Sequence, residues 1–395
     1  MREGIQTVYE VANNSDFQVD DDPSLLELMV DDMEASRAFY QPTKYWKGYT
    51  AAIIDLFRKV GLRDFRRSKE RVLSSFGCLD TIPDLQLSTF LNRSKNLTQD
   101  QLKNIEPYME FANSLWEQGV PVRPAGLNVS NFFSMSERLA DAKAEKVGIK
   151  LFSELSISKF GNPDGFIKDG SHRTFRSIYY FNFVCFVAQF AELSKYTTVV
   201  EIGSGSGAQA EILKKLFPQL TIVLLDLAPQ LYSAERYLTK SFPDDVVPYR
   251  ESNSKNWDSS LIQGKIYFLP LRAIENLAPK GKVLFWNAAS FGEMEPGIVK
   301  NYAKYIASFS ANLFLMQHFS GKHGPRVSVT MPVYEKAFSS YTLIAKSQST
   351  RADSVTPIFE DDDFYHNTFW QKNLIFFIVH WKRYVALRRI SSMRL

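Results

Sequence analysis

The chain has 395 residues, of which 45% are hydrophobic and 23% are charged, a balance typical of a globular protein with one large and one smaller domain. The formal net charge of +4 is too small to require a polyanionic partner, which argues against a nucleic-acid-binding protein. The two cysteines, Cys78 and Cys185, argue against a disulfide framework and a zinc site, and they favour a reducing cytoplasm.

The N-terminal part of the chain is predicted to be mainly helical. After a polar lead-in, Tyr49, Ile53, Phe57 and Val60 recur every three or four residues and give a helix one apolar face. A capping-box pattern that begins at Thr98 predicts a further helix start.

The segment 161–165 contains glycines and a proline and interrupts the helical pattern, so we place a domain boundary there. Residues 1–160 then form a helical N-terminal domain that covers a cleft, and residues 161–395 form the ligand-binding domain. A long, mostly apolar helix is predicted from Ser171 to Leu193. Its apolar stretch, 178–190, is shorter than the roughly 20 residues that span a bilayer, so no integral membrane segment is expected.

Short β-branched runs then alternate with helical stretches, which is typical of an α/β fold with a mainly parallel sheet. We predict seven strands, the last two forming an antiparallel edge: Thr198–Ile202, Thr221–Asp226, Ile266–Leu269, Lys282–Asn287, Leu313–His318, Tyr341–Ser347 and Asn373–Lys382. The segment 246–250 competes for the place of the third strand. The intervening helices are predicted at Ala208–Phe217, Gln230–Ser241 and Glu295–Phe309.

A glycine-rich loop, 203–207, lies between the first of these strands and a helix. Glycines there permit a tight turn and let the backbone approach a ligand closely. The next strand ends at Asp226, where a carboxylate can accept hydrogen bonds from ribose hydroxyls. The sequence thus predicts a nucleoside-type cofactor held by Gly203, Ser204, Gly205, Gly207, Asp226 and Leu227.

The same spacing also fits the loose dinucleotide pattern, so NAD is an alternative cofactor. Glu201 lies directly before the loop, and a buried carboxylate there would repel a pyrophosphate but suit a cationic ligand with an amino-acid moiety. Glu201 therefore favours S-adenosylmethionine (AdoMet) over NAD.

Four short motifs resemble those of the sugar O-methyltransferase family, within the class I AdoMet-dependent methyltransferases. They are Pro42–Trp46, Gly161–Pro163, Asp226–Pro229 and Ser290–Met294, and together they extend the resemblance from about Pro42 to about His318. The chain departs from the family at Ser204 and Ser206, where a glycine and an aromatic residue are common, and at Ala288, where serine is common.

The resemblance implies a seven-stranded Rossmann-like class I methyltransferase sheet, AdoMet as cofactor, and transfer of a methyl group to a hydroxyl of a sugar or glycosylated small molecule. Three alternatives stay open: a methyltransferase for a non-sugar natural product, an NAD-dependent oxidoreductase, and a scaffold that has kept the fold without activity. The expected partner is a small-molecule or glycan acceptor, and a homo-oligomer is compatible with the sequence.

A general base that removes the hydroxyl proton should follow the fourth or fifth strand, at the carboxyl edge of the sheet. Glu293 and His318 are the two candidates there, while His323 in a loop and His172 are weaker ones. Asn287 closes the fourth strand and is a candidate cofactor contact.

Two charged segments late in the chain are interpreted without a catalytic role. The acidic run 360–363 is predicted to be a solvated loop, so no metal site is expected. The basic segment 381–394 is predicted to be a surface tail, with contact to an anionic membrane surface or glycolipid as the alternative.

Overall fold

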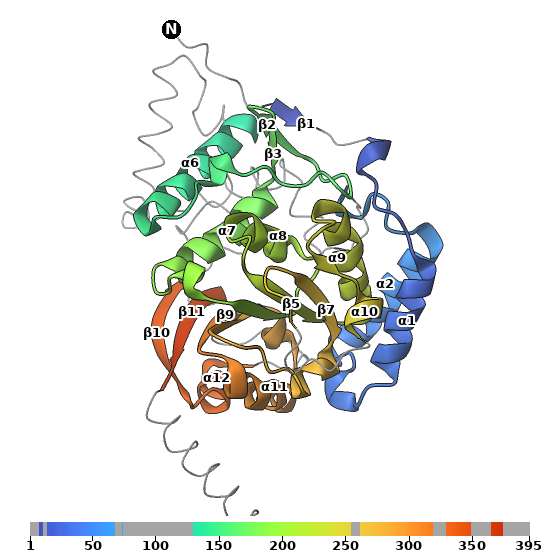
Figure 1. The fold of residues 1–395 in the computed structure, drawn as a ribbon, viewed down its shortest axis with the longest axis vertical. Helices are drawn as coiled ribbons and strands as arrows, with labels where there is room; N and C mark the ends of the chain where they lie inside the picture. Colours follow the sequence, from blue (N-terminus) through green and yellow to red (C-terminus); the bar gives the residue numbers. More distant parts are fainter. Residues whose placement is uncertain are drawn as a thin grey trace, which may run out of the picture.

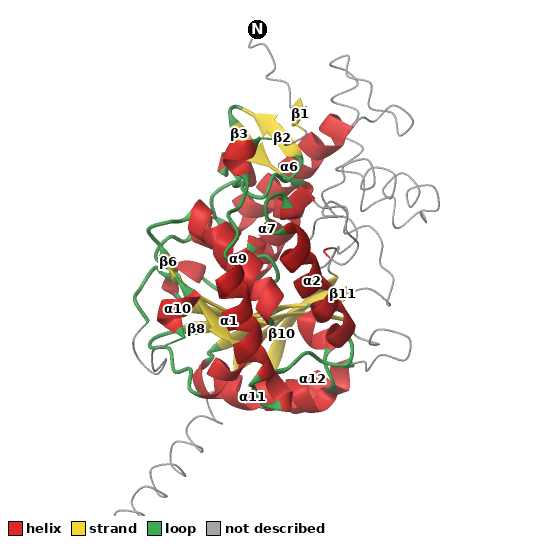
Figure 2. Cartoon of the chain, turned by 90° about the vertical axis from the view of Figure 1, so that its right-hand side faces the viewer, coloured by secondary structure: helices red, strands yellow, loops and turns green. Residues whose placement is uncertain are grey.

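A computed structural model describes residues 8–10, 14–67, 73, 129–253, 261–318, 329–348 and 365–373. These residues form a large central sheet with helices on both faces, and a small three-stranded sheet lies at one end of the molecule (Figure 1). Seen along the sheet, the helices enclose it as two layers (Figure 2).

The central sheet has the strand order β10-β11-β9-β8-β4-β5-β7-β6. Its strands pair in parallel from β6 to β9, and β11 alone runs antiparallel to both of its neighbours. The strands are β4 (Thr198–Ile202), β5 (Thr221–Asp226), β6 (Val246–Val247), β7 (Ile266–Pro270), β8 (Val283–Ala288), β9 (Asn312–His318), β10 (Tyr341–Gln348) and β11 (Tyr365–Lys372). The predicted Rossmann-like α/β sheet with an antiparallel edge is thereby confirmed, with β6 as an additional two-residue strand.

The helices follow the strands closely and cover both faces of the sheet (Figure 1). Helix α8 begins after Gly207, whose φ of 80° ends the glycine loop, and α9 and α11 each begin with a proline in the first turn. The bounds are α7 (Phe175–Ala188), α8 (Ala208–Leu216), α9 (Ala228–Ser241), α10 (Tyr249–Ser252), α11 (Pro296–Phe309) and α12 (Met331–Ala337).

Two predicted elements differ from the structure. The helix expected from Ser171 starts only at Phe175, because Thr174 caps it through a reciprocal hydrogen bond with Ser177. The preceding residues form strand β3 (Ser171–Arg173), which pairs with β2 (Gly165–Lys168).

The last strand of the sheet lies at Tyr365–Lys372, ahead of the predicted Asn373–Lys382, of which only Asn373 is described. The observed strand is rich in polar residues, including His366, Asn367 and Thr368, whereas the run after it is more apolar. Residues 360–363, 323 and the basic tail lie outside the described part of the chain, as does the predicted helix start at Thr98.

The N-terminal helices α1 (Pro23–Glu34) and α2 (Trp46–Val60) pack against α9 of the sheet layer. Ile53 and Phe57 are buried on the predicted apolar face of α2, whereas Val60 at its end is 59% exposed. The third helix, α6 (Val129–Val147), packs against α7.

Strand β1 (Val8–Glu10) pairs antiparallel with β2, so strands from both sides of the predicted boundary near residue 160 share one small sheet. A two-domain division at that point stays a prediction. Over the described residues, none of the helices combines the length and the apolar character needed to cross a membrane.

Candidate active site

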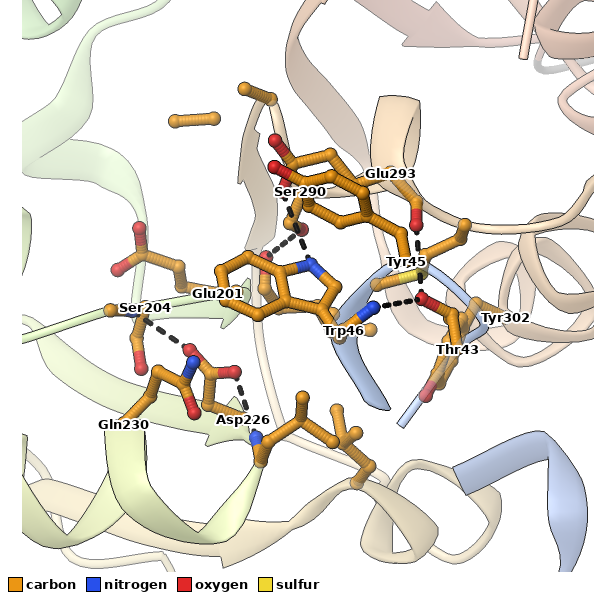
Figure 3. A pocket seen from close by; sticks show the side chains of 18 of the residues that line it. Thr43, Tyr45, Trp46, Glu201, Ser204, Asp226, Gln230, Ser290, Glu293 and Tyr302 are labelled. Carbon is orange, nitrogen blue, oxygen red and sulfur yellow. Dashed lines mark hydrogen bonds between the residues drawn. The ribbon is translucent and has the colours of Figure 1, made fainter. Parts of the chain in front are cut away.

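A cavity of about 310 Å³ opens at the carboxyl ends of β4, β5 and β8, where the ligands of open α/β sheets bind. Its walls combine the glycine loop with side chains at the start of α2 and in the segment after β8 (Figure 3). Side chains of α7 also line the cavity. The lining includes three carboxylates, Glu201, Asp226 and Glu293, and several aromatic residues. One cavity therefore joins the predicted cofactor loop to a second, aromatic half.

The glycine loop is held in shape by close packing against Ser290. Gly203 has a φ of 81°, and a Cβ atom there would lie 2.2 Å from the Ser290 hydroxyl oxygen. That hydroxyl donates to the carbonyl oxygen of Ile202 at 3.1 Å, directly at the end of β4. A side chain at position 203 is therefore excluded both by the backbone conformation and by the space.

Asp226 is tied to this loop by its carboxylate. It accepts hydrogen bonds from the backbone N–H groups of Gly205 at 2.8 Å and Leu227 at 2.7 Å. Burial raises the pKa of Asp226 to about 7, and the nearby charge of Glu293 adds to this, although the two backbone hydrogen bonds oppose it. The carboxyl thus lies at the cavity wall with its oxygens fixed in direction, as ribose recognition requires.

Glu201 is the most deeply buried acid of the cavity, with 2% of its surface exposed. Among the described residues its Oε2 atom has no hydrogen-bond partner. Burial raises its pKa well above the usual value, and repulsion from Asp226 adds to the rise. A cation in the cavity would satisfy this buried oxygen, so the site suits a positively charged ligand.

The chemical groups of the predicted cofactor match the residues that line the cavity. AdoMet carries a ribose, a sulfonium and an ammonium group, and the cavity offers Asp226 for the first and Glu201 for a positive charge. The glycine loop leaves backbone free of side chains beside both acids. The residues present therefore fit AdoMet, whereas two buried acids beside the loop do not favour a pyrophosphate.

The second half of the cavity is built where the N-terminal segment meets the segment after β8. The Trp46 indole N–H donates to Glu293 Oε2 at 3.1 Å, and the Thr43 hydroxyl donates to the Glu293 carbonyl oxygen at 3.1 Å (Figure 3). The backbone N–H of Lys44 donates to Glu295 Oε1 at 3.3 Å. Two motifs that are distant in the sequence, Pro42–Trp46 and Ser290–Met294, are thus in direct contact.

Aromatic side chains form much of the remaining wall. Tyr45, Trp46 and Tyr49 at the start of α2 contact one another, with ring centroids 5.4–5.9 Å apart. Tyr179 and Tyr180 of α7 line the same cavity, with Arg176 stacked on both rings. Sequence reasoning assigned none of these five side chains to the site, although the motif at Pro42–Trp46 contained two of them.

Most predicted cofactor residues line the cavity, namely Glu201, Gly203, Ser204, Gly205, Asp226 and Leu227. Gly207 lies behind the loop, against Leu238 and Ala234 of α9. Asn287 is not among the lining residues. Its amide donates to the Ile202 carbonyl oxygen at 2.7 Å and to Ser290, so it braces the end of β4 against the following segment.

The candidate bases differ in their position relative to the cavity. Glu293 lines the cavity. His318 ends β9 beside Tyr365 of β11, and its side chain is not described. His172 is buried in β3 with Nδ1 3.1 Å from the carbonyl oxygen of Ile157, and it is not a lining residue. In the described part of the chain, no group of three or more His, Cys, Asp or Glu could hold a metal ion.

Comparison with known proteins places this site in a family context. Residues 173–252, which include the glycine loop and Asp226, match the model of an O-methyltransferase domain. No curated protein matches the chain by sequence.

Several solved structures are similar over part of the chain. They include the mitomycin 7-O-methyltransferase MmcR (12% identity, TM-score 0.35, 50% of this chain and 54% of that one) and the pyocyanin biosynthetic protein PhzM (8%, 0.33, 47% and 53%). A third is magnesium protoporphyrin IX methyltransferase from Synechocystis PCC 6803 with bound SAM (9%, 0.35, 50% and 80%). The chain spans about half the length of the first two proteins.

The fold is a Rossmann-like α/β fold, and the segment that carries the loop after β4 and the acid after β5 matches an O-methyltransferase domain. AdoMet is the cofactor that such a domain uses.

Proposed function

We propose that this chain transfers the methyl group of AdoMet to a hydroxyl of a sugar or of a glycosylated small molecule. The observation that carries the proposal is the position of Glu293, a carboxylate held by Trp46 at the aromatic end of the cavity that also contains Asp226. A base and a cofactor site thus share one enclosed space.

AdoMet, when bound, supplies an electrophilic methyl carbon. Asp226 binds the ribose hydroxyls, and Glu201 balances positive charge from within the sheet. The glycine loop contributes backbone groups, because no Cβ atom at Gly203 separates it from the ligand.

Glu293 removes the proton of the acceptor hydroxyl as the new carbon–oxygen bond forms. The Trp46 N–H donates to its Oε2 atom and fixes the direction of the carboxylate at the cavity wall. The aromatic side chains of α2 and α7 keep water away from the reacting groups. His318 remains the second candidate for the base.

The aromatic wall supports a sugar acceptor, because flat aromatic rings can pack against the apolar faces of a sugar ring while the base reaches a hydroxyl. A non-sugar natural product with a phenolic hydroxyl would use the same wall. NAD-dependent oxidoreduction is disfavoured by three carboxylates around one cavity, which would repel a pyrophosphate. Cys185 is a buried free thiol, which suits the reducing cytoplasm that we propose as the compartment.

The test is methyl transfer from AdoMet labelled in its methyl group to matched acceptor pairs, each a phenol and its glycoside. We expect labelled glycosides in which the methyl group is on the sugar, and no labelling with the Glu293→Gln variant. If only the phenols were labelled, the acceptor would be a non-sugar molecule and the sugar proposal would be wrong. Calorimetric binding of NAD in place of S-adenosylhomocysteine would overturn the methyltransferase proposal altogether.

A further inference from the structure

The charges around the cavity are unbalanced in a way that points to one further residue. Among the described lining residues, three are acidic (Glu201, Asp226 and Glu293), and Arg176 is the one cation. AdoMet brings two positive groups into this cavity, but it also brings the carboxylate of its methionine part. Of the charged side chains that line the described cavity, Arg176 is the one that would attract that carboxylate.

The guanidinium of Arg176 is held in a fixed place. It stacks on the rings of Tyr179 and Tyr180, with its central carbon 4.8 and 4.7 Å from the two ring centroids. Its Nη2 atom donates to the Tyr180 hydroxyl at 2.9 Å. Tyr179 is fixed in turn by a hydrogen bond from its hydroxyl to Met316 Sδ at 3.2 Å, at the end of β9. An arginine held in this way keeps its positive charge at the cavity wall and can bind a carboxylate with little loss of side-chain freedom.

Arg176 also lies at the correct edge of the sheet. Only residues 189–197 connect the end of α7 to the start of β4, so the helix runs back along the strand and its first turn lies where β4 ends. Helix α7 packs against α8, the helix that begins at the glycine loop. The first turn of α7, which carries Arg176, and the glycine loop therefore face the same cavity.

We infer that Arg176 binds the methionine carboxylate of AdoMet and that the tyrosine pair Tyr179 and Tyr180 positions it for that contact. The inference rests on AdoMet as the cofactor and names no acceptor. Every AdoMet molecule carries this carboxylate, whereas an acceptor need not carry an anion, which is why the cofactor is the preferred partner.

The experiment is a binding cycle measured by calorimetry without any acceptor. The ligands are S-adenosylhomocysteine and its decarboxylated analogue, and the proteins are the wild type and Arg176→Gln. We expect Arg176→Gln to bind S-adenosylhomocysteine about 10–100-fold more weakly, and to bind the decarboxylated analogue as the wild type does. Arg176→Lys should lie between the two, because it keeps the charge but loses the paired N–H geometry.

Lys282→Gln is the matched control, since Lys282 also stacks on a tyrosine, with its Nζ atom 4.2 Å from the Tyr196 ring centroid, but does not line the cavity. It should leave the affinity for both ligands unchanged. Unaltered affinity of Arg176→Gln for S-adenosylhomocysteine would overturn the inference, and a raised KM for the acceptor would then assign Arg176 to the acceptor. Equal weakening of both ligands would also overturn it, because the loss would then be structural. Since no acceptor is present, a failed sugar assignment cannot produce either result.

Discussion

The two halves of the cavity are built on different principles. Apart from Arg176, the cofactor half comes from one stretch of chain, 201–230, and its groups are backbone N–H donors and two buried acids. The aromatic half, where we propose that the acceptor binds and which we call the acceptor half, is assembled from the separate segments 39–49, 179–180, 288–302 and 316 through contacts between side chains. The first half is thus fixed by local turn geometry, and the second depends on how remote parts of the chain pack.

This difference predicts which half tolerates change. At Gly203 an added methyl group would meet Ser290 at 2.2 Å, so the loop allows almost no variation. In the acceptor half, Tyr49 is only half-buried and can be replaced with small local shifts. The predictions below test this contrast between a rigid cofactor half and a variable acceptor half.

The largest effect is expected from Glu293→Gln. The variant keeps an acceptor for the Trp46 N–H but cannot take the acceptor proton, so kcat should fall by about 10²–10⁴-fold. The affinity for S-adenosylhomocysteine should stay within about twofold of wild type, because binding and proton removal occur in different halves. An unchanged kcat in this variant would show that Glu293 is not the base. His318 would then be the remaining candidate, and the His318→Ala variant would test it.

Asp226→Ala should weaken S-adenosylhomocysteine about 100-fold, because the ribose loses a charged acceptor and the Gly205 N–H loses its partner. Calorimetry measures this directly. Unchanged affinity would show that the ribose is bound elsewhere. The matched control is Glu235→Gln, a buried carboxyl of α9 that does not line the cavity.

Gly203→Ala should lower the free energy of unfolding by about 2–3 kcal/mol, since the residue combines a φ of 81° with contact to Ser290. Gly297→Ala provides the comparison, because no heavy atom lies within 4 Å of its added Cβ. Urea unfolding of both variants gives the difference. Equal stability of the two would remove the argument that the loop is sterically fixed.

Asp226 also predicts a pH dependence of stability. Its pKa is raised from 3.8 to about 7 in the folded chain, so this group stabilises the cofactor-free protein below about pH 4, and that contribution is lost as the pH rises through about 7. Asp226→Asn should therefore be more stable than wild type at pH 8 by on the order of 2 kcal/mol, by about half as much at pH 5.5, and by almost nothing near pH 4. A difference that does not change with pH would contradict this account.

The smallest effect is expected from Trp46→Phe. The change removes the N–H that directs Glu293 but keeps an aromatic ring, so kcat should fall about threefold to tenfold with cofactor affinity unchanged. Tyr49→Phe, in the same aromatic cluster, should change kcat by less than about twofold. An unchanged kcat in the Trp46→Phe variant would show that Trp46 contributes packing and that its N–H does not direct Glu293.

The same division explains what the sequence could reveal. The residues Glu201, Gly203, Ser204, Gly205 and Asp226 lie within one strand–loop–helix–strand unit, where spacing alone determines geometry, and all of them line the cavity. Trp46 and Arg176 could not be assigned in this way, because their place in the cavity depends on packing between α2, α7 and the sheet. Asn287 illustrates the reverse case: its position at the end of β8 suggested a ligand contact, but its amide braces Ile202 and Ser290.

The prediction of the strands and helices was limited for a related reason. Most strands from β4 to β10 follow from β-branched runs between helices, whereas β11 was expected several residues too late because its polar residues, among them His366, Asn367 and Thr368, weaken the pattern although the strand lies between β10 and β9. The start of α7 depended on the Thr174 cap, a local signal that a general apolar stretch concealed.

The contact between Trp46 and Glu293 has a consequence for how such an enzyme can change its substrate. The residues that would surround the proposed acceptor on this side belong to one short stretch at the start of α2, outside the sheet. Exchanging that stretch with one from a relative would alter which molecule is methylated while the donor site stays as it is. Acceptor choice is in this sense carried by an interchangeable segment of the chain.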